Sequence, residues 1–178
     1  MSAPFFTIGH STHSADEVVA MLREAGVGAL ADVRRFPRSR SNPAFNIDSF
    51  PEVLAQAGIR YRHFPALGGR RNRQAGIAPE VNAFWHEPAF HNYADYALGE
   101  EFAAALAGLL AWADAQPVAV MCSEAVWWRC HRRIITDHLL LSGHRVTHLM
   151  APGHADAAQP TPGATRDGAG RVTYPAEG

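Results

Sequence analysis

Val118-Ala119-Val120-Met121-Cys122 is the run of sequence that decides the fold. Five consecutive apolar residues between Pro117 and the polar pair Ser123-Glu124 predict a short buried strand. Residues 129–142 then predict a helix that ends at Gly143, and residues 146–150 predict a further buried strand. A strand, a helix and a second buried strand in this order indicate a parallel sheet.

The alternation of strands and helices extends toward the N-terminus. Strands are predicted at residues 5–8, 29–33 and 59–64, and helices at 15–25, 50–57 and 92–116. Capping-box pairs, Ser14 with Glu17 and Ser49 with Glu52, mark the starts of the first two helices. We therefore expect an α/β fold: a single domain with a doubly wound, mostly parallel sheet of about five strands flanked by helices, a Rossmann-like three-layer sandwich.

The composition changes after residue 150, where Pro, Gly, Ala and Asp dominate. We expect residues 1–150 to form the α/β core domain and residues 151–178 to form a C-terminal extension. Asp167-Gly168, inside residues 166–174, is a hairpin-turn signal, so the extension can form a short hairpin.

The overall composition is that of a folded protein close to neutrality. The chain has 178 residues, 47% of them apolar, and a formal net charge of −1 at pH 7. No apolar run approaches the roughly 18 residues that cross a bilayer, and the N-terminus has no signal-peptide pattern. We therefore expect a cytoplasmic protein without a membrane partner. In that reducing compartment the two cysteines, Cys122 and Cys130, would be free thiols, metal ligands or a redox pair.

The basic residues are all arginine, sixteen in number. Genomic codon bias predicts such a count, and so does anion recognition, because a guanidinium binds phosphate or carboxylate through two hydrogen bonds. Nine arginines lie between Arg34 and Arg73, against only two acids. This segment is either a solvated face, paired with the acidic segment 80–114, or a cradle for an anionic substrate or nucleic acid. The aromatic residues that could offer stacking surfaces beside it, or else pack in the core, are Phe36, Phe45, Tyr61, Phe64, Trp127 and Trp128.

Polar residues follow the predicted strands at their carboxyl ends, where parallel sheets of this class bind ligands. Four pairs occupy these positions: His10 and Ser11, Asp32 and Arg34, Gly68 and Gly69, and Ser123 and Glu124 directly after Cys122. We expect them to gather at one edge of the sheet. Ser11, Ser123, Arg34, Arg40 and Arg132 are the candidate anion-binding residues.

Cys122 is the first candidate for chemistry, because a thiol between a strand and a helix can face helix N-terminal amides that stabilise a thiolate. Its alternative is an inert buried cysteine. A cysteine phosphatase needs an arginine six residues after the cysteine, where this chain has Trp128, with Arg129 one residue later. A sulfur-transfer site, a zinc site with Cys130 and His131, and a Cys122–Cys130 disulfide stay open as well.

The motifs together resemble the domain of unknown function 488 family. The resemblance is carried by residues 7–11, by Asp32-Val33-Arg34 and by Leu67-Gly68-Gly69-Arg70, and most specifically by Met121-Cys122-Ser123-Glu124 with Cys130-His131-Arg132. It spans residues 7 to about 150 and implies a single α/β domain in which the cysteine motif is one unit. The family name implies no reaction.

The leading functional expectation is a thiol-dependent enzyme, a hydrolase, transferase or redox enzyme, that acts on an anionic substrate. Cys122 would be the nucleophile or redox thiol and Cys130 its resolving partner, with His131 or His10 transferring the proton. Glu124 would orient a histidine or an arginine. A nucleic-acid-binding module that uses the Arg34–Arg73 face, and a small Cys/His metal site, are the alternatives. We expect no cofactor and assign no metal ligand.

Overall fold

The computed structural model describes residues 3–176 and confirms the expected α/β class. Six strands form one sheet in the order β3-β2-β4-β1-β5-β6, and all neighbours are parallel except β5 and β6. The strands are β1 Phe5–Gly9, β2 Ala29–Asp32, β3 Arg60–His63, β4 Val118–Cys122, β5 Val146–Ala151 and β6 His154–Ala157, with a separate hairpin of β7 Thr165–Arg166 and β8 Val172–Thr173. The helices are α1 Ala15–Glu24, α2 Phe50–Gln56, α3 Pro88–Tyr96, α4 Glu100–Ala113 and α5 Arg132–Leu141.

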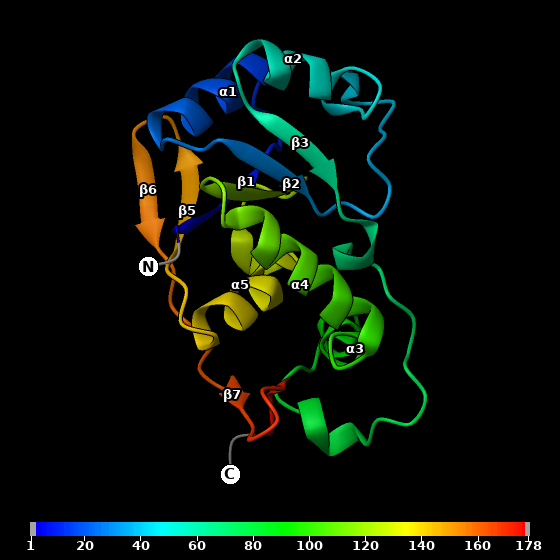
Figure 1. The fold of residues 1–178 in the computed structure, drawn as a ribbon. Coiled ribbons are helices and arrows are strands. Elements are labelled where there is room, and N and C mark those ends of the chain that lie inside the picture. The colour runs from blue at the N-terminus through cyan, green and yellow to red at the C-terminus, as the bar shows by residue number, and fades with distance from the viewer. Residues whose placement is uncertain (1–2, 177–178) are drawn as a thin grey trace.

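The sheet is the middle of three layers (Figure 1). Helices α1 and α2 cover one face, and α4 and α5 cover the other. The central strand β4 serves both cores, because its side chains alternate between the two faces. Ala119 and Met121 pack with the residues of α1 and α2, while Val118, Val120 and Cys122 pack with those of α4 and α5. This alternation turns the Cys122 thiol toward α5.

The strand order places a crevice between the carboxyl ends of β1 and β4. These strands are neighbours, yet the helices that follow them, α1 and α5, leave to opposite faces of the sheet. Such a switch point opens a ligand site in doubly wound sheets. The segments that follow β1 and β4 stay hydrogen-bonded to each other beyond the strands. His10 N donates to Cys122 O and Ser11 N donates to Ser123 O, each at 3.0 Å.

Several sequence predictions about helices needed correction. The single helix predicted over residues 92–116 is wrong: α3 ends at Tyr96, and α4 begins at Glu100 after Gly99. The helix predicted from residue 129 begins at Arg132, after a 3₁₀ turn at Trp127–Arg129. Only the first capping box forms. Glu17 N donates to Ser14 Oγ at 3.0 Å, whereas the Ser49 hydroxyl donates to backbone carbonyls of the preceding turn.

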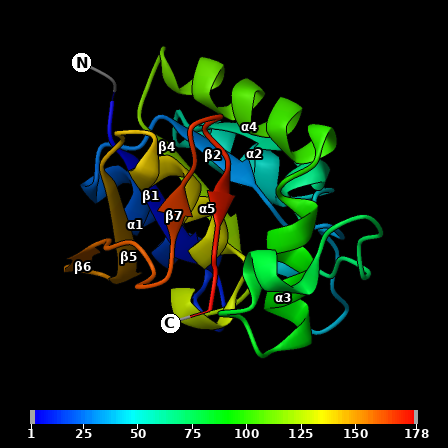
Figure 2. The ribbon, with the colours of Figure 1, turned by 90° about the horizontal axis from the view of Figure 1, so that it is seen from below.

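The chain beyond residue 150 adds to the packed structure. β6 extends the sheet by pairing with β5, and the β7–β8 hairpin lies beside α5 (Figure 2). Tyr174 is fully buried, and its hydroxyl donates to Asp137 Oδ2 at 2.7 Å. The domain division at residue 150 stays a prediction.

None of the helices in residues 3–176 has the length and apolar character that a membrane span requires.

Candidate functional site

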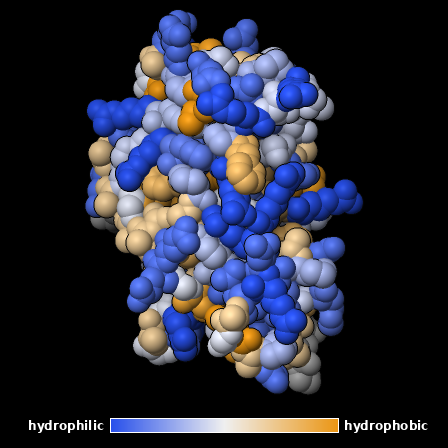
Figure 3. Space-filling view, turned by 90° about the vertical axis from the view of Figure 1, so that its right-hand side faces the viewer, coloured by the Kyte–Doolittle hydropathy of each residue, from blue (hydrophilic) through white to orange (hydrophobic). Residues whose placement is uncertain are grey.

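A cavity of about 570 Å³ opens at the carboxyl ends of β1, β2 and β4. Loops that follow these strands and β3 supply most of its wall. The face that carries the loops after β2 and β3 shows many hydrophilic residues in the space-filling view (Figure 3). The lining residues are His10, Ser11, Arg34, Arg35, Phe36, Arg38, Ser39, Ser41, Asn42, Gly69, Arg70, Ala89, Phe90, Tyr93, Cys122, Ser123, Glu124, Arg129, Cys130 and His131.

The two cysteines meet at the base of this cavity. Cys122 Sγ and Cys130 Sγ lie 2.7 Å apart as free thiols, both almost fully buried. A disulfide bond is about 2.05 Å long, so oxidation of the pair to a disulfide would require only a small movement of the two sulfurs. Cys122 comes from the end of β4, and Cys130 comes from the turn just before α5.

The partners of the two sulfurs differ. Cys130 Sγ accepts the backbone N–H of Arg132 at the start of α5, at 3.4 Å, whereas Cys122 Sγ donates to Glu124 O at 3.8 Å. Burial alone would raise the pKa of Cys130, but its hydrogen bond with Cys122 and the charge and backbone N–H of Arg132 lower the pKa overall. Burial and the neighbouring Cys130 raise the pKa of Cys122 well above its usual value. Cys130 is therefore the more acidic of the two thiols.

His131 adjoins the same sulfur. Its Nδ1 lies 3.5 Å from Cys130 Sγ, and its Nε2 lies 2.7 Å from Val33 O. A carbonyl accepts only from N–H, so Nε2 carries the proton and Nδ1 faces Cys130 with a free lone pair. Burial lowers the pKa of His131, which keeps the ring neutral. Gly69 permits this placement, because a Cβ there would come within 2.8 Å of Nδ1.

Arg132 lies behind the thiol pair with only 1% of its surface exposed. One Nη donates to Glu124 O at 2.9 Å, the other to Thr7 Oγ1 at 3.4 Å, and Nε has no partner. Within residues 3–176 no carboxylate pairs with this guanidinium. A buried charge without a counter-ion is costly, and a Cys130 thiolate would offset that cost.

Arg34 is buried too, but it is fully paired. It donates from Nε and Nη2 to the two oxygens of Asp32, at 2.9 and 2.8 Å, and also to Phe45 O at 2.6 Å. Tyr61 donates its hydroxyl to the same Asp32 carboxylate, and burial together with this contact raises the Tyr61 pKa. Arg34 therefore forms part of the cavity wall, and its positive charge is largely neutralised by Asp32.

His10 packs between these groups. Its ring stacks on Phe45 with centroids 4.3 Å apart, and its Nε2 lies 3.3 Å from Arg34 Nη1. Burial, and then the charge of Arg34, lower the His10 pKa to about 4. Nε2 is occupied as an acceptor, and Nδ1 lies 3.4 Å from Ser11 O. Of the two histidines predicted to transfer a proton, His131 is the one in contact with a thiol.

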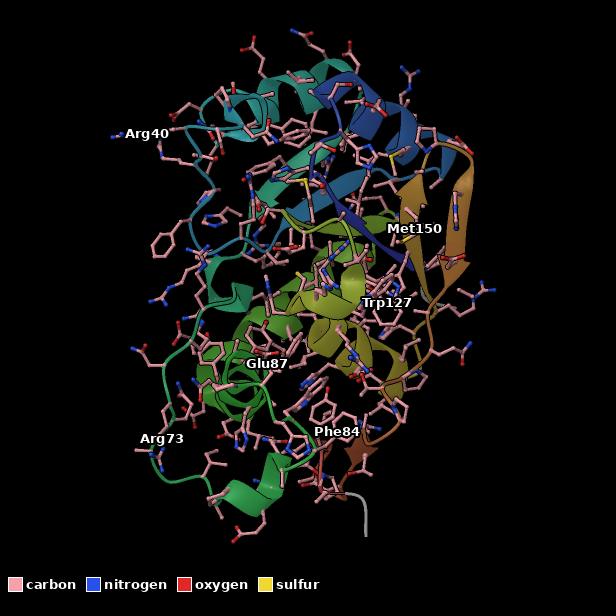
Figure 4. All side chains as sticks on the ribbon, turned by 180° about the vertical axis from the view of Figure 1, so that it is seen from behind. Arg40, Arg73, Phe84, Glu87, Trp127 and Met150 are labelled. Carbon is pink, nitrogen blue, oxygen red and sulfur yellow. The ribbon has the colours of Figure 1, made fainter. Side chains whose placement is uncertain are left out.

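The remaining predicted residues separate into two groups. Ser11, Ser123 and Glu124 line the cavity, and Glu124 meets Arg132 through its carbonyl oxygen. Arg40 is exposed, lies outside the lining and projects from the molecule (Figure 4), and Arg132 lies behind the cavity wall. Sequence reasoning did not single out Arg35, Arg38, Arg70 or Arg129 as binding residues. Their positions after strands β2, β3 and β4 are the signal that could have found them.

No group of three or more His, Cys, Asp or Glu side chains in the described part of the chain is arranged to hold a metal ion. Cys122, Cys130 and His131 are adjacent, and His131 turns Nδ1 toward Cys130 while its Nε2–H donates to Val33 O.

Comparison with known proteins gives a single assignment. A search of curated proteins and a search of solved structures each return no match. The family model described as "Domain of unknown function DUF488" matches residues 14–139, a span that contains α1 through most of α5 and the whole cysteine motif. The chain therefore belongs to the DUF488 family.

Proposed function

We propose that the protein is a thiol-dependent enzyme that acts on an anionic substrate, with Cys130 as the nucleophile. The observation that carries this proposal is the asymmetry of the thiol pair: Cys130 accepts from the α5 backbone while Cys122 donates to a carbonyl. A helix N-terminus and a nearby arginine are the surroundings that favour thiolates in reactive cysteines. The roles are thus the reverse of those expected from sequence, where Cys122 was the nucleophile.

The residues around Cys130 have separate roles in a nucleophilic displacement. His131 Nδ1 takes the Cys130 proton, and the thiolate attacks an electrophilic atom of the substrate. As the bond from sulfur to that atom forms, the bond to the leaving group breaks. The leaving group departs with the bonding electron pair and accepts the proton from His131. Arginines of the wall attract the anionic part of the substrate.

Two-electron redox chemistry is the second candidate, and the 2.7 Å separation of the two sulfurs favours it. A small disulfide would be the oxidant. Cys130 attacks one of its sulfurs and releases one thiol, and Cys122 then attacks Cys130 Sγ and releases the second. The protein gains one disulfide bond and the reagent becomes two thiols. Both proposals place the protein in the cytoplasm, whose reducing conditions keep the pair free.

Competitive alkylation tests the nucleophile. The reduced protein is treated at pH 7 with less than one equivalent of iodoacetamide, and the modified cysteine is identified by peptide mass spectrometry. We expect labelling of Cys130 at least about tenfold above Cys122, because the two pKa values are shifted in opposite directions. Cys122→Ser should keep the fast reaction and Cys130→Ser should lose it. Equal labelling, or faster labelling of Cys122, would contradict the proposal.

A further inference from the structure

Five arginines line the cavity, and Glu124 is its only acid. Three of the five are engaged elsewhere: Arg34 with Asp32, Arg38 with Asp48, and Arg35 with the carbonyl of Arg70 at 2.7 Å. The guanidinium groups of Arg70 and Arg129 have no hydrogen-bond or ion-pair partner among the described residues. They come from different loops, after β3 and after β4, so two unpaired cationic groups border one cavity.

Backbone strain marks the same cavity. In residues 3–176 the non-glycine residues with positive φ are Ser11, at 40°, and Arg70, at 60°. Both line the cavity. Such conformations cost free energy and cluster at sites that bind ligands. The hydrogen bond from Arg35 to the Arg70 carbonyl fixes the turn that carries the Arg70 side chain.

An exposed aromatic ring completes the wall. Phe36 is 65% exposed, which makes it the most exposed large apolar side chain that the structure describes. The Arg35 guanidinium carbon lies 5.3 Å from its ring centroid, a cation–π contact that helps to hold the ring. Burying this apolar face against a planar ligand would be favourable, because nucleic-acid bases stack on exposed aromatic rings.

We propose that the cavity binds a nucleotide, with its phosphate between Arg70 and Arg129 and its base stacked on Phe36. The volume of about 570 Å³ lies in the range of pockets for such small ligands. This inference names the substrate class of the proposed enzyme and rests on that function only for the chemistry that follows binding. A free nucleotide and a single-stranded nucleic acid present the same two groups.

Titration calorimetry on a Cys122→Ser/Cys130→Ser double variant tests binding without thiol chemistry. The probes are AMP, adenosine and ribose 5-phosphate. We expect AMP to bind at least about tenfold more tightly than either fragment, since each fragment lacks one of the two contacts. No AMP binding at millimolar concentration, or equal affinity for AMP and ribose 5-phosphate, would overturn the proposal.

Variants of the wall give the second test, in the same double-variant background. Arg70→Asn, which keeps a residue that tolerates positive φ, and Arg129→Ala should each weaken AMP binding about tenfold or more. Arg73→Ala is the matched control. It lies in the loop that holds Arg70, is exposed and is outside the lining (Figure 4). Phe36→Ala should weaken AMP binding but leave ribose 5-phosphate unchanged. An Arg73→Ala effect as large as that of Arg70→Asn would count against the site.

Binding of an oligoadenylate of ten nucleotides distinguishes a free nucleotide from a single-stranded nucleic acid as the ligand. Binding tighter than AMP, with a steep loss in added salt, assigns the site to a nucleic-acid strand. Equal or weaker binding assigns it to a free nucleotide. The binding test and the alkylation test can fail separately. If AMP binds but Cys130 is unreactive, the nucleotide proposal stands and the thiol proposal is wrong. If Cys130 is reactive but AMP does not bind, the thiol proposal stands and the nucleotide proposal is wrong.

Discussion

Two buried arginines, Arg34 in the cavity wall and Arg132 beside Cys130, have different surroundings. Arg34 is 8% exposed and donates to both oxygens of the Asp32 carboxylate. Arg132 is 1% exposed and donates only to uncharged oxygens, those of Glu124 O and Thr7 Oγ1. The first arginine is neutralised by its own ion pair, and the second keeps a positive charge in the interior.

The difference distinguishes an arginine that stabilises the fold, Arg34, from one whose charge changes the pKa of a nearby thiol, Arg132. An ion pair with good geometry satisfies its own charge and has little effect on its neighbours. An unpaired buried guanidinium acts on every titratable group nearby, and it lowers the pKa of Cys130, which lies beside it. Each region can be disturbed separately, and the effects should differ in kind.

Asp32→Ala should cause the largest effect. It leaves the Arg34 charge buried without a partner and removes the acceptor of the Tyr61 hydroxyl. We expect the free energy of unfolding to fall by about 3–5 kcal/mol, measured by urea denaturation. Arg132→Met is the contrasting variant and should change stability by less than about 1 kcal/mol, because it breaks no ion pair. Equal losses of unfolding free energy in the two variants would contradict the difference described between Arg34 and Arg132.

Acid should destabilise both regions, in part through one buried histidine in each whose pKa is lowered to about 4. Burial, and then the nearby arginine charge, lower the pKa of His10 (beside Arg34) and of His148 (beside Arg132) from 6.5 to about 4. Between pH 6.5 and 4, these two histidines are therefore protonated in the unfolded chain and neutral in the folded chain. Stability is fully present above pH 6.5 and falls between pH 6.5 and 4, by about 3 kcal/mol for each histidine.

Phenylalanine variants test this slope. Both rings stack on aromatic partners, His10 on Phe45 and His148 on Trp127, so His10→Phe and His148→Phe keep the packing. Each should flatten the loss of stability between pH 6.5 and 4, followed by urea denaturation at several pH values. The exposed His154→Ala should leave the slope unchanged. A slope that both phenylalanine variants leave intact would show that these rings already carry a proton in the folded state.

Gly9→Ala should disturb the Arg132 side alone. A Cβ at Gly9 would lie 1.6 Å from Glu124 O, the carbonyl that accepts from Arg132 and from the Cys122 thiol. The loop must move, and we expect a loss of about 1–3 kcal/mol together with slower alkylation of Cys130. Gly168→Ala, with nothing within 4 Å of the added Cβ, is the control. Unchanged stability and reactivity in Gly9→Ala would contradict the packing described.

The sequence predicted the fold through its local patterns. Apolar strand runs and the Ser14 capping box depend on near neighbours, so the sheet and α1 could be anticipated. The break between α3 and α4 could not, because Tyr93 and Tyr96 hold α3 through hydrogen bonds to Leu67 O and Ala66 O, far away in the chain. Strand β6 was missed as well: its sequence, His154–Ala157, lacks an apolar run because it lies exposed at the sheet edge.

The site shows the same limit. Strand-end positions predicted that Ser11, Cys122 and Ser123 would gather at one edge of the sheet. All three line the cavity, together with Cys130 and His131. Which thiol is the more acidic depends on the α5 backbone and on the absence of a carboxylate near Arg132 within residues 3–176, and a sequence pattern carries neither. Arg34 and Arg132 therefore look alike in sequence, and three dimensions are needed to tell them apart.

The pKa of Cys130 tests the central claim most directly. The rate of iodoacetamide alkylation is measured against pH in Cys122→Ser, where the serine hydroxyl keeps a hydrogen-bond donor, and again with Arg132→Met added. We predict a midpoint below the ordinary thiol value of about 8.5 in the first protein. The added Arg132→Met should raise that midpoint, because it removes the positive charge that lowers the Cys130 pKa. A midpoint at or above 8.5, or one that Arg132→Met leaves unchanged, would contradict the account.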